Sequence, residues 1–303
     1  MRLTDKIGGE KAKIAHLALS ADGRWLAAGG IQNGLKVIEL SGHGADVRDL
    51  GEISAYSLSL SPDGRFLAGT PGTGGRLYLW DLGQTKPILK SVEIEGRTVS
   101  ATAFSRDGRY LVTGERDGRM YVWNVDGFPA APAPLLGHDA DITALTFSAD
   151  SKILLTGDLK GRVMAWHFAG PSSEVRFGLQ HQTYVTAVAI DPASQLIATA
   201  DLDGRVLLWS AREGLLIGEV FTDLTVDAYG NRMYPYALSF DRESERLSAL
   251  FRDGRRVDWL IQPADWIEAA CRIANRRLRD EDRVEDGFAR PCGELLSHNS
   301  VPN

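Results

Sequence analysis

Apolar and polar residues alternate along much of the chain, in segments of five or six residues separated by short polar turns. Residues 142–147 read ITALTF, the turn SADS follows, and ILLTG at 153–157 is joined through DLKG to RVMAWHF at 162–168. Alternation with a period of two is typical of a β-strand with one buried face, and turns rich in Asp and Gly join such strands into hairpins. This stretch therefore predicts three antiparallel strands.

This three-strand unit recurs along the chain. The segments TGERDGRMYVW, TGDLKGRVMAW and TADLDGRVLLW begin at Thr113, Thr156 and Thr199, each 43 residues after the last. Six units are found, and they begin near Ile14, Ser54, Thr98, Asp141, Tyr184 and Tyr234. We interpret their repeated Asp-Gly-Arg strings as type I′ hairpin turns, in which both central residues have positive φ.

A fourth short strand can lie between units, as in SSEVRFGLQH at 172–181. A four-stranded sheet of this size cannot bury both of its faces alone, so neighbouring sheets must stack. Sheets that stack radially around an axis leave no exposed end. We therefore predict an all-β fold, a six-bladed β-propeller.

The order of these motifs resembles the WD repeat, over about residues 1–261. The resemblance implies a structural tetrad, a hydrogen-bonded chain of four side chains within a blade. The fifth unit matches it at His181, Thr199, Asp203 and Trp209. The fourth unit has His138, Thr156 and Trp166 with Lys160 at the aspartate position, and the third has Thr113, Asp117 and Trp123 with Glu95 in place of His. The first unit has Ile38 where Trp is expected.

The resemblance also predicts how the ring closes. In propellers of this kind the N-terminal strand commonly completes the last blade, and RLTDKI at Arg2–Ile7 supplies a candidate. We therefore divide the chain into a propeller, residues 1–261, and a C-terminal helix and tail, residues 262–303.

The C-terminal segment has the pattern of an amphipathic helix. Its apolar positions fall at helical spacing, at Trp266, Ala270, Ile273, Ala274 and Leu278. Such a helix either packs on its own domain or docks on a partner. The string WIEAACRIANR resembles a segment that follows WD repeats in bacterial proteins, where the propeller is joined to STAND-type NTPases, caspase-like proteases or kinases. This resemblance implies a role in bacterial signalling or defence.

Composition and charge exclude several partners. The formal net charge is −6 with no basic block, so nucleic acid is not an expected partner. No stretch approaches the eighteen apolar residues of a membrane span, and only Cys271 and Cys292 are present. We expect a soluble, cytoplasmic protein.

Motifs for catalysis or cofactor binding are not found. The six histidines have no metal-ligand spacing, and the glycine-rich PGTGG at 71–75 lacks the Lys-Ser/Thr of a phosphate loop. We therefore predict a non-catalytic protein-binding scaffold without metal or cofactor. One alternative is a hydrolase-like or lactonase-like propeller enzyme with its site at the channel mouth. Another alternative is that the protein is the substrate or the inhibitor of a protease.

The predicted binding surface is the set of loops that enter the inner strands, which the resemblance places at the top mouth of the channel. Aligned on the repeat, their residues are Lys13, Ser54, Thr98, Asp141, Tyr184 and Tyr234. Tyr and Arg are enriched at binding hot spots. We therefore add Arg252 of a nearby turn and Tyr229 of the inserted loop 223–236 as partner-binding candidates. Phe251 of the same turn and Met233 of the same loop are added because they are large apolar residues in polar surroundings.

Overall fold

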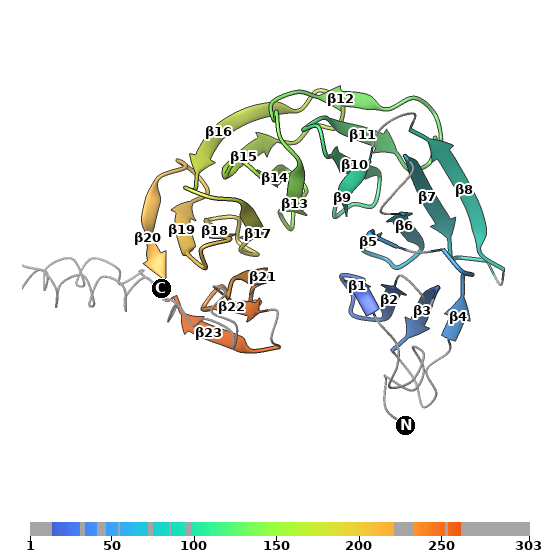
Figure 1. Ribbon diagram of the computed structural model, residues 1–303, viewed down its shortest axis with the longest axis horizontal. Coiled ribbons are helices and arrows are strands. Elements are labelled where there is room, and N and C mark those ends of the chain that lie inside the picture. Colours follow the sequence, from blue (N-terminus) through green and yellow to red (C-terminus); the bar gives the residue numbers. More distant parts are fainter. Residues whose placement is uncertain are drawn as a thin grey trace, which may run out of the picture.

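The described strands form six antiparallel sheets arranged around a central axis (Figure 1). The structure is a computed structural model, and it describes residues 14–30, 34–40, 47–53, 55–71, 75–84, 86–94, 98–220, 233–251 and 254–261. The innermost strands of successive sheets lie beside one another, and the first and sixth sheets form the two ends of the arc in Figure 1. The prediction of a six-bladed β-propeller is confirmed.

Five of the six sheets contain four described strands. The first sheet consists of β1 (Ile14–Leu19), β2 (Trp25–Gly30), β3 (Leu35–Glu39) and β4 (Val47–Asp49). The second consists of β5 (Ser57–Leu60), β6 (Phe66–Thr70), β7 (Arg76–Asp81) and β8 (Ile88–Glu93). The third consists of β9 (Val99–Phe104), β10 (Tyr110–Glu115), β11 (Met120–Asn124) and β12 (Ala133–Leu135).

The remaining sheets follow the same order. The fourth consists of β13 (Ile142–Phe147), β14 (Ile153–Asp158), β15 (Arg162–His167) and β16 (Glu174–Gln180). The fifth consists of β17 (Val185–Ile190), β18 (Leu196–Asp201), β19 (Val206–Ser210) and β20 (Leu216–Val220). The sixth has three described strands, β21 (Pro235–Phe240), β22 (Arg246–Phe251) and β23 (Arg256–Leu260).

The turn between the first two strands of each sheet depends on one residue with positive φ. Glycine occupies this position in the first three sheets, as at Gly23 with φ 71°, because glycine has no Cβ to clash. Serine occupies it in the last three, at Ser151, Ser194 and Ser244. The type I′ prediction is wrong here. The amide of Gly23 donates to the carbonyl of Ser20, so the central residues of that turn are Ala21 and Asp22, and neither has positive φ.

Apolar clusters join consecutive sheets. In the cluster between the second and third sheets, Leu77 and Leu79 of β7 pack with Phe104 of β9 and Trp123 of β11. Comparable clusters join the first sheet to the second, the third to the fourth, the fourth to the fifth and the fifth to the sixth. The core of the protein is therefore a series of sheet-to-sheet interfaces.

Hydroxyl groups add polar links between some of these sheets. The Oγ of Ser100 donates to the carbonyl of Ile142 at 2.8 Å, and Oγ1 of Thr143 donates to the carbonyl of Val185 at 2.6 Å. Both hydroxyl residues are the unpaired residue of a β-bulge near the start of an inner strand. The bulges thus connect the third sheet to the fourth, and the fourth to the fifth.

Two expectations fall outside the described residues. These are the closing strand at 2–7 and the helix of the C-terminal segment 262–303. Among the residues that the structure describes, no helix is long and apolar enough to cross a membrane.

Candidate functional site

The fifth sheet contains a buried chain of hydrogen bonds that ends on a different aspartate from the one expected. The indole Nε1 of Trp209 donates to Oγ1 of Thr199 at 2.8 Å, and Oγ1 lies 2.6 Å from Nε2 of His181. Nδ1 of His181 lies 3.0 Å from Oδ2 of Asp201. Asp203 was expected in this role, but it lies two residues further on, in the turn that follows β18. The resemblance, which assigned this role to the aspartate of the Asp-Gly turn, therefore misplaced the acidic residue.

The fourth sheet repeats this chain with its own aspartate. Oγ1 of Thr156 accepts from Nε1 of Trp166 at 3.0 Å, and both ring nitrogens of His138 lie 2.6 Å from their partners, Thr156 and Asp158. Lys160 was expected at the aspartate position, but it lies beyond β14 with its ammonium 3.0 Å from Oδ2 of Asp139. Burial lowers the pKa of His138, although the neighbouring Asp158 opposes this shift.

The third and first sheets depart from the full tetrad. Trp123 donates to Thr113 at 3.0 Å, while the buried Glu115 takes the register position of Asp158 and Asp201. Asp117 lies in the turn after β10, and Glu95 lies outside the described residues. In the first sheet, Ile38 is fully buried where the other sheets carry Trp. The side chains of Thr113, Glu115, Trp123 and Ile38 are thus buried within the fold and are not accessible to a partner.

The second candidate site is a surface that we call the rim, in which the same backbone hydrogen bond recurs in several sheets. We use this name for the residues around the starts of the inner strands, at the end of the ring opposite the β1–β2 turn. The carbonyls of Thr98, Asp141 and Tyr184 each accept a hydrogen bond from an amide of the facing loop, at 3.0, 3.0 and 2.9 Å. The donors are Arg116, Leu159 and Leu202. Each predicted rim residue in these three sheets is thus held beside a loop residue.

Aromatic and charged side chains connect the rim across the first four sheets. The rings of His16 and Tyr56 are 5.6 Å apart, and the guanidinium of Arg116 lies over the Tyr56 ring at 5.6 Å. The same Arg116 reaches Asp141, with Nε 3.9 Å from Oδ2. Burial lowers the pKa of His16, so it is neutral at pH 7. Side chains from four sheets therefore form one continuous patch.

Three exposed tyrosines lie near the starts of inner strands, and one of them, Tyr56, belongs to this patch. Tyr56 is 39% exposed, Tyr184 48% and Tyr236 48%. Tyr234 and Met233 are partly buried beside Tyr236 in the chain. Tyr236 is the last residue of the inserted loop 223–236. His16 and Tyr56 were not predicted as contact residues, although each is an aromatic residue close to the start of an inner strand.

The remaining predicted contact residues either lie outside the described residues or are buried. Lys13, Ser54, Tyr229 and Arg252 lie outside the described residues. Phe251 is only 4% exposed, so its expected role as an exposed anchor is wrong. It pairs with Pro235 in the same register in which Asp201 pairs with Val185, so it takes the inward position of the tetrad acid.

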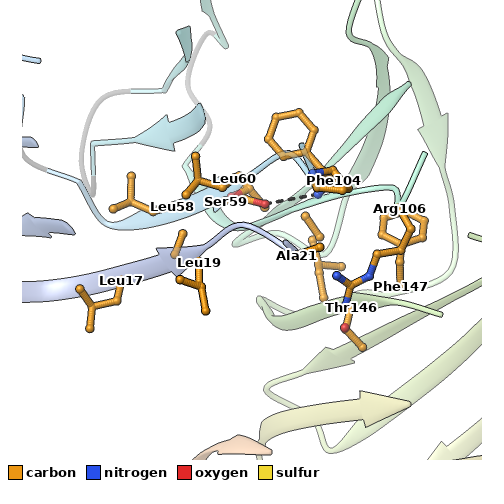
Figure 2. Close-up of a pocket in the computed structure, with 15 residues that line it drawn as sticks. Leu17, Leu19, Ala21, Leu58, Ser59, Leu60, Phe104, Arg106, Thr146 and Phe147 are labelled. Carbon is orange, nitrogen blue, oxygen red and sulfur yellow. Dashed lines mark hydrogen bonds between the residues drawn. The ribbon is translucent and has the colours of Figure 1, made fainter. Parts of the chain in front are cut away.

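A small hollow lies at the opposite end of the ring, where the turns between the first two strands gather (Figure 2). Its volume is about 220 Å³, and the inner strands of the first four sheets line it. The lining includes Leu17, Leu60, Phe104 and Phe147, with Arg106 as the one charged side chain. Although apolar residues are numerous in this lining, most of the surface that it exposes is polar. In the part of the chain that the structure describes, no group of His, Cys, Asp or Glu side chains could hold a metal ion.

Stacked four-stranded sheets with an aromatic, charged rim define a β-propeller whose exposed end suits contact with another protein. A family model of the WD domain, G-beta repeat, matches residues 34–81, 89–124, 133–167 and 173–210, which together exceed half of the chain. The chain therefore belongs to the WD40 family. Membership of this family indicates a protein-interaction platform.

Solved structures share the fold. The β-propeller domain of Cps50 (Swd1) from Myceliophteria thermophila superposes with a TM-score of 0.69 at 13% identity, covering 82% of this chain and 84% of that chain. At this identity the likeness shows the fold alone. A comparison with curated protein sequences finds no match.

Proposed function

We propose that the protein acts without catalysis as a binding platform that holds a protein partner on its rim. We further propose that it is the recognition or regulatory subunit of a bacterial signalling or defence complex. The observation that carries the first proposal is the continuous patch of His16, Tyr56, Arg116 and Asp141. Tyrosine and arginine offer large contact areas and hydrogen bonds, and they are enriched at the centres of protein interfaces.

The rim is also well suited to binding because its backbone is fixed. The repeated hydrogen bonds at Thr98, Asp141 and Tyr184 hold the loops before binding begins. A partner therefore meets a surface that loses little conformational entropy on binding. Among the described residues, no group of His, Cys, Asp or Glu side chains could hold a metal ion for catalysis.

The proposed class of partner is supported by the sequence of the C-terminal segment. The string WIEAACRIANR at 266–276 resembles the segment that follows WD repeats in bacterial proteins carrying STAND-type NTPases, caspase-like proteases or kinases. We therefore propose a partner from one of these three classes.

The test begins with purification of the tagged protein from its native host and identification of the protein that co-elutes with it. The affinity of that partner is then measured for wild type, Tyr56→Ala and Tyr184→Ala. We expect each substitution to weaken binding by more than about 1 kcal/mol, roughly fivefold in Kd. Thermal stability should change little, because both side chains are at least 39% exposed.

Leu216→Ala is the matched control, because Leu216 is 54% exposed on β20, an outer strand away from the rim. Its Kd should equal that of wild type. Unchanged affinity in both tyrosine variants would refute binding at the rim. A co-eluting protein that belongs to none of the three classes would refute the proposed signalling or defence role and leave the rim test intact.

A further inference from the structure

The first sheet has an apolar face that no other described sheet covers. Each of the five clusters between neighbouring sheets contains residues from both sheets. A sixth cluster, built on Ala28 and Ile38 with Leu26 and Val47 packed against it, contains residues of the first sheet only. This is the face that an adjoining sheet would cover in a closed ring.

Ala28 and Ile38 are buried, whereas two leucines of β1 on the same face are exposed. Leu17 is 59% exposed and Leu19 is 57% exposed. The residues equivalent to Leu19 in the next three sheets pack against the preceding sheet and are 7%, 6% and 3% exposed, namely Leu60, Phe104 and Phe147. Figure 2 shows Leu17 and Leu19 projecting from β1 on the side away from Leu58.

The corresponding face of the sixth sheet is polar. Arg256 donates from Nε to Oδ1 of Asp258 at 2.8 Å and from a terminal nitrogen to Oγ of Ser248 at 3.1 Å. The side chains of Arg256 and Asp258 are 62% and 36% exposed. In the other five sheets the positions of this ion pair are apolar and almost fully buried: Leu35 and Val37, Leu77 and Leu79, Met120 and Val122, Val163 and Ala165, Val206 and Leu208. The sixth sheet therefore offers Leu17 and Leu19 no apolar surface.

We propose that residues 264–278 of this chain form a helix that covers the exposed face of the first sheet. Its apolar side, with Trp266 and Ile273, packs on Leu17 and Leu19. Its charged side faces the polar pair Arg256 and Asp258. An element between these two sheets must be apolar on one side and charged on the other, and the sequence pattern of this segment meets that requirement.

The end of the last strand leads to this location. The amide of Ile261 donates to the carbonyl of Glu245, which puts the end of β23 beside the turn between β21 and β22. Leu19 directly precedes the equivalent turn between β1 and β2, so both residues lie at the same end of the ring. The proposed helix begins three residues after Ile261 and would be about 22 Å long at 1.5 Å per residue. It therefore starts at the same end of the ring as Leu19.

The native Cys271 in the middle of this segment allows a direct test by cross-linking. Leu19→Cys is made in the full-length chain with Cys292→Ser, so that Cys271 is the only other thiol. A short bismaleimide is added, and the linked peptides are identified by mass spectrometry. We expect an efficient link within one chain between position 19 and Cys271. Leu216→Cys, equally exposed on β20, is the matched control and should give no such link.

A second measurement separates docking from chance proximity. Ile273→Asp should displace the helix and raise the maleimide labelling rate of the Leu19→Cys thiol several-fold, with no change for Leu216→Cys. Links only between two chains would show that a second copy covers the face, and would overturn the proposal. Equal labelling rates with and without Ile273→Asp, or labelling of both thiols without a link, would also overturn it.

Discussion

The identity of the acidic residue in the fifth sheet leads to a sharp prediction about stability. Asp201 is fully buried; Oδ2 lies 3.0 Å from Nδ1 of His181, and Oδ1 accepts the amide of Arg205 at 3.0 Å. Asp203 lies two residues later, partly exposed in the turn. We compare Asp201→Asn with Asp203→Asn, because the two substitutions are chemically identical.

The expected cost follows from these contacts. An asparagine at 201 has one carbonyl oxygen, so it can keep only one of the two hydrogen bonds and turns its amide hydrogens toward the other donor. A hydrogen bond to a charged group contributes about 1.5–3 kcal/mol, and a buried donor without an acceptor adds to the loss. We therefore expect Asp201→Asn to lower the free energy of unfolding by about 2 kcal/mol. Asp203 is less buried than Asp201, so we expect Asp203→Asn to lower the free energy of unfolding by less than Asp201→Asn does.

The assay is equilibrium unfolding in urea, followed by tryptophan fluorescence, with Tm from circular dichroism as a second measurement. A loss of 2 kcal/mol corresponds to a decrease in Tm of roughly 4–8 °C. The reasoning is refuted if Asp203→Asn destabilises the protein as much as Asp201→Asn or more. That result would return the aspartate of the tetrad to the position that the Asp-Gly spacing predicts.

Two further predictions follow from buried side chains. Phe251→Ala should lower the free energy of unfolding by about 3 kcal/mol in urea titrations, because Phe251 is 4% exposed; a change below about 0.5 kcal/mol would mean that the ring lies on the surface. Burial lowers the pKa of His138 in the folded state, so the unfolded chain binds more protons as the pH falls through the unfolded value of about 6.5. The stability that the folded state gains from neutral His138 is present above that pH and is lost below it. The urea midpoint should therefore decrease between pH 7.5 and pH 5.5, and less so in His138→Gln; a midpoint that rises, or an equal decrease in both proteins, would contradict this assignment.

The alternation of residues and the repeat of 43 predicted the hairpins, the six sheets and their stacking, because these depend on local spacing and on burial of one face. The side chains of the tetrad were harder to place. The Asp-Gly turn marks the end of the hairpin, whereas the register of β18 determines which aspartate faces His181. The same register carries Phe251 inward, although its neighbours in the sequence are typical of an exposed turn.

The rim was predicted in outline only. The repeat identified Thr98, Asp141 and Tyr184 as equivalent residues, and each holds an equivalent backbone hydrogen bond. The contact of Arg116 with both Tyr56 and Asp141 depends on how adjacent sheets are placed in space. The spacing of residues within one repeat unit does not show which side chains of adjacent sheets meet, so the patch could be described only from the structure.

Hydrogen–deuterium exchange of the protein, with and without its co-purified partner, tests the role of the rim most directly. The amides of Arg116, Leu159 and Leu202 report on this surface, because each is bonded to the carbonyl of a rim residue. We predict that partner binding slows exchange in the peptides that contain these amides and leaves the outer strands β8, β16 and β20 unchanged. Slower exchange confined to those outer strands, with the rim peptides unaffected, would contradict the proposal that the rim is the binding surface.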